Sequence, residues 1–184
     1  MSTLKTNVIQ TVAGKPILQS TGSILQVIHT ELTTSFIATS VLIPDVGYYT
    51  DVTGLSGTIT PTSTTSKILI FTNMYIGPGG NGYQQHFRIN RNGTAVILGS
   101  GEGGRPTSTG RINLYTANTH TMFQFSGVHY DSPASVSTLT YQIALGGYSS
   151  APTVYVNRPE TFSVATNNYD STPVSTLTLM EVSA

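Results

Sequence analysis

The sequence predicts an all-β protein, a two-sheet antiparallel jelly-roll sandwich with an extended N-terminal arm. Three observations support this prediction. Apolar residues recur at a spacing of about two, the period of a half-buried strand. Thr and Val are frequent, and both favour strands. Clusters of Gly, Pro, Asn, Asp and Ser separate many short apolar segments, as in sandwiches and jelly rolls, and no window has the spacing of a long amphipathic helix.

The strands are predicted from local patterns along the chain. SILQVIHTEL (23–32) and SKILIFTNMYIG (66–77) each alternate between two faces. Within 85–98, Asn92-Gly93 predicts a hairpin, because this dipeptide supplies the two positive-φ residues of a type I′ turn. Further strands are predicted at 111–116, 121–130, 137–145, 152–157, 161–166 and 174–183, and exposed Gly-rich loops at 77–82 and 99–106.

The composition changes near Gly22, where we place a domain boundary. Residues 1–22 contain a few apolar side chains without an evident hairpin partner, whereas the regular strand pattern begins after them. We therefore expect an extended docking arm over 1–22 and a jelly-roll sandwich over 23–184.

The arm contains Gly14-Lys15, but this pair does not form a phosphate-binding loop. Such a loop needs a glycine where this chain has Ile9, and a Ser or Thr where it has Pro16. Pro16 instead favours an extended backbone at the residue before it. We expect the arm to bend at Gly14, to stay extended at Pro16, and to be anchored by three apolar side chains, those of Val12, Ile17 and Leu18.

Composition and charge exclude several classes of function. The chain is 38% hydrophobic but only 9% charged, against about 25% charged in an average protein, and its net charge is +0. Its eight Lys and Arg residues form no basic stripe, so we expect no nucleic-acid binding. No apolar run suits a membrane span or a signal peptide, so we expect neither. The chain has no cysteine, which excludes disulfides and thiolate zinc sites.

The residue types that carry catalysis are few and show no motif. Four histidines, at positions 29, 86, 120 and 129, lack the spacing of metal ligands. The eight acidic residues form no evident pair, and Asp131 stands in a YDSP turn signature. No serine lies in a G-x-S-x-G elbow. We therefore expect a protein that is not an enzyme and that binds neither a metal nor a cofactor.

Tyrosine is the residue most suggestive of binding, with ten Tyr and no Trp in the chain. Tyr83, Tyr148 and Tyr169 fall in predicted loops beside Gly, Asn and Ser. Exposed tyrosines in such surroundings suit contacts with sugars or proteins, so these three are receptor-contact candidates. Ordinary packing in strands and interfaces is the alternative explanation for most tyrosines.

Several motifs together resemble those of small bacteriophage virion proteins. They are TVAGKPIL near the start, VTGLSGTITPTSTTSKILI (52–70), RNGT (91–94), DSP with LTYQI (131–143) and LTLMEV (177–182). In this order they are similar to tail-fibre or appendage proteins of cyanophages and related marine phages, with a C1q/TNF-like jelly roll. The resemblance covers nearly the whole chain. The long shaft of larger tail fibres is absent, which leaves room for a short appendage.

The resemblance implies a homotrimer that docks to other virion proteins, of the tail or the capsid, through its N-terminal arms. It also implies that the loops contact a host-surface glycan or protein, and that the protein is part of a virion assembled in the host cytoplasm. Two alternatives remain open. One is a capsid or tail decoration protein without a receptor, and the other is a soluble carbohydrate-binding lectin of jelly-roll type.

Overall fold

The computed structural model describes residues 21–43, 47–78, 84–114, 118–147, 153–162 and 170–184. These residues form two antiparallel β-sheets and no α-helix, which confirms the predicted all-β sandwich. Most of the predicted arm lies outside the described residues and stays a prediction. The first described residues are tied to the last strand, because Gly22 N donates to the carbonyl of Ser183 (2.8 Å) and Ser183 N donates to that of Ser23 (2.9 Å).

The two sheets contain six strands each within the described residues. The first sheet has the order β1-β12-β5-β11-β2, with β9 on the other edge of β5, and the second has the order β3-β4-β10-β6-β7, with β8 also paired to β6. The strands are β1 (Ile24–Leu32), β2 (Phe36–Thr39), β3 (Val41–Ile43), β4 (Gly47–Ile59), β5 (Lys67–Gly77), β6 (Gln84–Arg91), β7 (Thr94–Val96), β8 (Gly110–Asn113), β9 (Phe123–Asp131), β10 (Leu139–Gly147), β11 (Thr153–Val156) and β12 (Ser175–Val182). A 3-10 turn, η1 (Glu102–Gly104), lies between β7 and β8.

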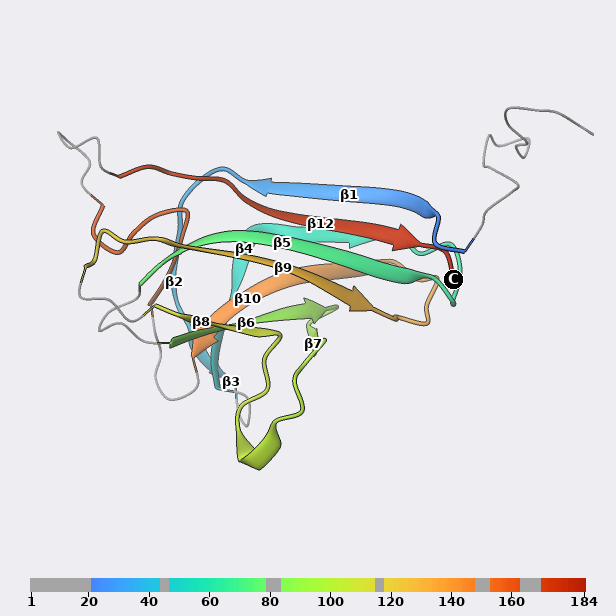
Figure 1. Cartoon of the computed structure of the whole chain (residues 1–184), viewed down its shortest axis with the longest axis horizontal. Coiled ribbons are helices and arrows are strands. Elements are labelled where there is room, and N and C mark those ends of the chain that lie inside the picture. The colour runs from blue at the N-terminus through green and yellow to red at the C-terminus, as the bar shows by residue number, and fades with distance from the viewer. Residues whose placement is uncertain (1–20, 44–46, 79–83, 115–117, 148–152, 163–169) are drawn as a thin grey trace, which may run out of the picture.

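The chain passes repeatedly from one sheet to the other, which is the connectivity of a jelly roll. β1 and β2 lie in the first sheet, β3 and β4 in the second, and β5 returns to the first. The same exchange recurs from β8 to β9, from β9 to β10, and from β10 to β11. Figure 1 shows β1, β12, β5 and β9 as the upper layer, above β10, β6 and β8.

The core lies between the sheets and is built by alternation along the strands. In β5 the inward residues Ile68, Ile70, Thr72 and Met74 are buried, while the outward residues that alternate with them are half-buried. β6 and β10 contribute Phe87 and Ile143 from the other sheet. Burying one such side chain stabilises the fold by roughly 1.5–3 kcal/mol, so this interior supplies most of the favourable free energy of folding.

Most predicted strands are confirmed, and the hairpin is formed as the sequence indicates. Asn92 and Gly93 have φ of 50° and 80°, and they connect β6 to β7. β2, β3 and β4 were not predicted. β4 lacks strict alternation because Gly54, with φ of 87°, lies in an irregularity of its pairing with β10. The strand predicted at 161–166 is not seen at its two described residues, 161 and 162, and the rest of it lies outside the described residues.

A buried asparagine joins three segments of the first sheet. Asn157 follows β11, is fully buried and has φ of 58°. Its backbone N–H donates to the carbonyl of Tyr75 (2.8 Å), and its side-chain amide donates to the carbonyls of Leu32 (2.6 Å) and Thr34 (3.1 Å). Its side-chain oxygen accepts a hydrogen bond from the Ser175 hydroxyl (2.6 Å), which itself accepts one from Tyr75 N (3.1 Å).

These hydrogen bonds compensate for a break in the strand pairing along one edge of β5. The same edge of β5 pairs first with β12 and then with β11, so its backbone groups would lose their partners where one short strand ends and the next begins. Asn157 and Ser175 supply those partners at Tyr75. Thr109 does the same on the second sheet, where its hydroxyl accepts from Ile89 N (3.1 Å) and donates to the carbonyl of Val96 (3.3 Å).

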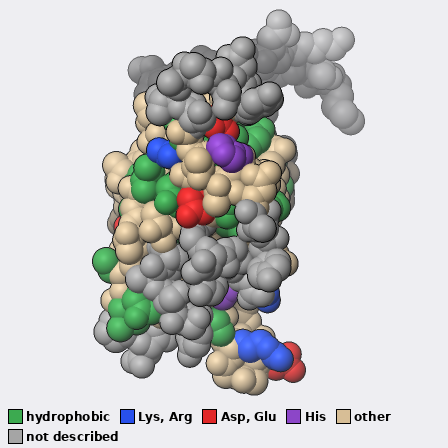
Figure 2. All heavy atoms as spheres, turned by 90° about the vertical axis from the view of Figure 1, so that its left-hand side faces the viewer, with side chains coloured by type: hydrophobic (Ala, Val, Ile, Leu, Met, Phe, Trp, Pro, Cys, Tyr) green, Lys and Arg blue, Asp and Glu red, His purple; other side chains and the backbone are tan. Residues whose placement is uncertain are grey.

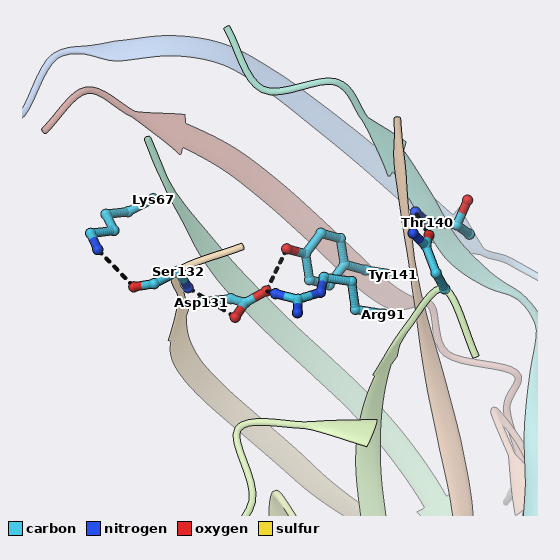
Figure 3. Close-up of polar contacts among 7 residues, drawn as sticks. Lys67, Arg91, Asp131, Ser132, Thr140 and Tyr141 are labelled. Carbon is cyan, nitrogen blue, oxygen red and sulfur yellow. Dashed lines mark hydrogen bonds and ion pairs between the residues drawn. The ribbon is translucent and has the colours of Figure 1, made fainter. Parts of the chain in front are cut away.

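Asp131 links the two sheets at one end of the sandwich (Figure 3). One of its oxygens accepts hydrogen bonds from Arg91 (2.7 Å) on β6 and from the Tyr141 hydroxyl (2.6 Å) on β10. Its other oxygen accepts from Ser132 N (2.8 Å). The turn predicted at YDSP therefore accounts for the hydrogen bond of only one Asp131 carboxylate oxygen, the one that accepts from Ser132 N. Burial raises the pKa of Tyr141, and the hydrogen bond to Asp131 raises it further, so Tyr141 stays a neutral donor.

Glu181 is a fully buried carboxylate near the end of β12. It accepts hydrogen bonds from the side-chain amide of Gln26 (2.5 Å), from the backbone N–H of Thr62 (2.7 Å) and from the Thr62 hydroxyl (2.8 Å). Burial alone would raise the pKa of Glu181, but these hydrogen bonds outweigh it and lower the pKa below its ordinary value. The carboxylate thus holds β1 and the 60–66 connection against β12.

We predict that Asn157→Ala destabilises the protein by about 3 kcal/mol, because it leaves the buried Leu32 carbonyl and the buried Ser175 hydroxyl without their partner and also removes the hydrogen bond to the Thr34 carbonyl. Chemical denaturation measures this change. Asn73→Ala is the matched control, since Asn73 makes its hydrogen bonds on the exposed outer surface of β5, and it should cost well under half as much. Equal losses for the two variants would contradict the structural role of Asn157.

The lowered pKa of Glu181 predicts an acid-dependent loss of stability. A group whose pKa is lower in the folded state stabilises the fold fully above its unfolded pKa and ceases to do so as pH falls through its folded pKa. Glu181→Gln should therefore be less stable than the native chain by about 1–3 kcal/mol at pH 7. Unfolding curves of the two proteins between pH 7 and pH 3 should converge on acidification. A difference that stays constant with pH would contradict this account.

Candidate functional site

The outer face of the first sheet carries a continuous apolar row across four strands. In the pairing register, Val27 of β1 lies opposite Met180 of β12, Met180 opposite Leu69 of β5, and Leu69 opposite Tyr130 of β9. Each alternates along its strand with a more deeply buried residue, so all four side chains face away from the core. Val27 and Tyr130 are 51% exposed.

The neighbouring row extends this apolar surface and then gives way to polar side chains. It runs from His29 through Thr178 and Phe71 to Val128, which is 60% exposed. His29 Nδ1 and the Thr178 hydroxyl are 2.7 Å apart and hydrogen-bonded. We call Val27, Leu69, Phe71, Val128, Tyr130 and Met180 the outer apolar face.

The third row is polar and marks the limit of the outer apolar face. It contains Glu31, Thr176, Asn73 and Ser126 in register. Asn73 accepts hydrogen bonds from the Ser126 hydroxyl and the Gln124 side-chain amide, both at 2.9 Å. An apolar centre with a polar rim is the organisation of a protein–protein interface, in which charged residues are depleted at the centre.

The sequence of β5 indicates the outer apolar face. In SKILIFTNMYIG both alternating faces hold large apolar residues, with Leu69, Phe71 and Tyr75 on the face that turns outward. A strand with one face in water ordinarily alternates apolar and polar residues. Large apolar residues on both faces of β5 are therefore the sequence signal for an outward apolar surface.

The site residues predicted from the sequence all lie outside the described residues. These are the arm positions Val12, Gly14, Pro16, Ile17 and Leu18, and the tyrosines Tyr83, Tyr148 and Tyr169. They stay predictions. Within the described part of the chain, no three His, Asp or Glu side chains gather in a way that could hold a metal ion. His86 and His129 are not brought together, because His129 faces Phe87 in the interior (ring centroids 5.8 Å apart) and His86 faces outward.

Charged side chains are sparse on the one side of the molecule that Figure 2 shows. Figure 2 shows the end of the sandwich that lies at the left in Figure 1, where the few blue and red side chains form no patch of one sign. In the described part of the chain, no helix has the length and hydropathy that crossing a lipid bilayer requires.

No protein-family model matches the sequence, and no curated protein matches it. The crystal structure of the infectious bursal disease virus VP2 subviral particle is similar to this chain, with a TM-score of 0.38 and 12% sequence identity. The match covers 99% of this chain and 45% of that chain, so the chain spans less than half the length of VP2.

Proposed function

We propose that this protein is a non-enzymatic structural component of a bacteriophage virion. In this proposal it is a homotrimeric tail-fibre or appendage protein, docked through residues 1–22, that presents its loops to the host surface. The observation that carries the proposal is the outer apolar face on a sandwich whose core is already complete without it. The motif resemblance to small phage virion proteins supports the same assignment.

The partner that best fits the outer apolar face is a second copy of this chain. A net charge of +0 leaves little electrostatic repulsion between copies. The outward side chains of β1, β12, β5 and β9 include only three ionisable groups besides tyrosine, those of His29, Glu31 and Lys67. A closed symmetric assembly, such as a trimer, would cover the apolar side chains of every copy.

The arm completes the proposal by connecting this assembly to the particle. Gly22 is hydrogen-bonded beside Ser183, and the row that contains Val27 and Met180 lies near this end of the sheet. Arms from neighbouring copies would therefore start close to the shared face. A segment without local structure gains its order from the surface that captures it.

A decoration protein that clamps the capsid or tail without a receptor is the alternative structural function. Both assignments need self-association and an arm, so only the location on the particle separates them. Imaging labelled protein on virions distinguishes the two, because an appendage projects from one site whereas a decoration protein covers a lattice.

We predict that the native chain has three times its monomer mass of 19.5 kDa in solution. Met180→Glu should yield monomers, because it places a carboxylate in the middle of the apolar row, where burial of an unpaired charge is costly. Light scattering coupled to size-exclusion chromatography measures both masses. Val41→Glu is the matched control, since Val41 is 65% exposed on β3 of the other sheet, and it should leave the mass unchanged.

Two results would contradict this prediction. A native chain that is monomeric at micromolar concentration would remove the trimer altogether. A Met180→Glu variant that keeps the native mass would show that copies associate through another surface.

We further predict that deletion of residues 1–20 leaves a folded, heat-stable sandwich that no longer incorporates into particles. Val12, Ile17 and Leu18 would each contribute roughly 1.5–3 kcal/mol to docking before ordering costs. Replacing Ile17 and Leu18 with serine should cause much of the same loss, whereas Lys15→Ala should matter less. Normal assembly of the truncated protein, or its failure to fold, would refute the docking arm.

A further inference from the structure

The edge strand β9 of the first sheet is paired on one side. It pairs with β5 along its nine residues, and within the described part of the chain no other strand is hydrogen-bonded to it. In an antiparallel ladder the backbone N–H and C=O groups of successive residues point alternately to the two neighbouring strands. Every second residue of β9 therefore directs its backbone N–H and C=O away from β5, toward an edge that no described strand occupies.

β9 lacks the features that usually protect an edge strand. Natural edge strands are commonly very short, interrupted by a bulge, or supplied with Lys or Pro. β9 has the sequence FQFSGVHYD and pairs with β5 without a bulge. Besides the inward-facing His129, its one charged residue is Asp131, whose carboxylate is already hydrogen-bonded to Arg91 and Tyr141. A long, uncharged edge strand is a template for pairing with a strand of another molecule.

The opposite edge of the same sheet offers a matching strand. β1 is also nine residues long, and among the described strands it pairs with β12 alone. β1 is antiparallel to β12, β12 to β5, and β5 to β9, so β1 and β9 run in opposite directions at the two edges of the layer (Figure 1). In a ring of copies arranged about an axis along the strands, β9 of one copy would therefore meet β1 of the next in antiparallel orientation.

The second sheet approaches β1 without pairing with its backbone. The side-chain amide of Gln26 donates to the carbonyl of Thr60 (2.7 Å), and the hydroxyl of Thr30 donates to the carbonyl of Ser56 (2.9 Å). Both bonds use side chains of β1. The backbone groups on this edge of β1 therefore stay available to a strand from another copy.

We infer that β9 of each copy pairs with β1 of the next copy, so that three first sheets form one closed sheet. This inference rests on the proposed trimer and names the backbone contact that builds it. Pairing of β9 with β9 of a second copy would be a two-fold contact that ends at two copies, whereas a β9–β1 contact is head-to-tail and can close a ring of three. The inner side of each first sheet packs on the second sheet of the same copy, so the outer apolar face would line the inside of the ring. Val27 and Tyr130, at the two ends of one apolar row, would lie on the two sides of each joint.

Engineered cysteine pairs test this contact, because the native chain has no cysteine. Val128→Cys on β9 is combined in turn with Val27→Cys, His29→Cys or Glu31→Cys, at three outward positions of β1. Within one copy β12 and β5 separate β1 from β9 by roughly 14 Å, whereas a disulfide needs Cα atoms within about 7 Å, so a disulfide between these strands must join two copies. We expect at least one double variant of the full chain to form covalent trimers on oxidation, measured by mass under non-reducing denaturing conditions. The matched single-cysteine variants should stay uncross-linked.

Amide hydrogen exchange, followed residue by residue by NMR, gives a second measurement on the native full chain. Both alternating sets of β9 amides should be protected, those of Gln124, Ser126, Val128 and Tyr130 and those of the residues between them. In the Met180→Glu variant, which should be monomeric, one set should exchange at least tenfold faster, while the set that is bonded to β5 stays protected.

The outcomes separate this inference from the proposed trimer. A trimer in which one set of β9 amides exchanges freely, or in which no cysteine pair cross-links, would overturn the inference and leave the trimer standing. Covalent dimers of the Val128→Cys single variant would overturn it in favour of a two-fold contact between two β9 strands. A monomeric native chain would overturn both. Thermal unfolding of each variant checks that the sandwich remains folded.

Discussion

The fold depends on satisfying the backbone of β5, the strand that borders β12, β11 and β9. Its inward side chains form the centre of the core, and its outward side chains form the middle of the outer apolar face. Both roles require one register, because a shift of a single residue would exchange the two sets of side chains. Asn157 and Ser175 fix that register where two short strands meet at one edge of β5. A buried polar group thus determines which apolar residues of β5 lie inside and which face outward.

Whether a feature could be predicted from the sequence depends on how far apart in the chain its interacting residues lie. The Asn92-Gly93 hairpin and the alternating strands depend on residues that are close together in the chain, so local sequence patterns predict them. The role of Asn157 was not predictable, because its partner Leu32 lies 125 residues away and nothing in PTVYVN marks a junction. β4 was missed for a related reason: the side-chain amide of Gln142, on β10, donates to the carbonyl of Val52 (2.7 Å), inside the irregularity that interrupts the alternation of β4.

The two outer faces of the sandwich differ in the polarity of their side chains. The first sheet presents apolar side chains in register, whereas the outward residues of the second include Arg88, Asn90 and Gln142. Each sheet of an antiparallel sandwich has only one face free of the core. If copies associate through the first sheet, the second sheet turns away from the assembly axis.

The low charge of the chain is consistent with this arrangement. Several of its few ionisable groups are buried with partners, among them Asp131 beside Arg91 and Tyr141, and Glu181 beside Thr62. These charges hold the sheets together and do little to keep molecules apart in water. A free monomer would then expose the outer apolar face with weak repulsion between copies, which favours association. If copies associate as proposed, only the ionisable groups of His29, Glu31 and Lys67 lie on the outward side of the first sheet, so few charges would lose water in that contact.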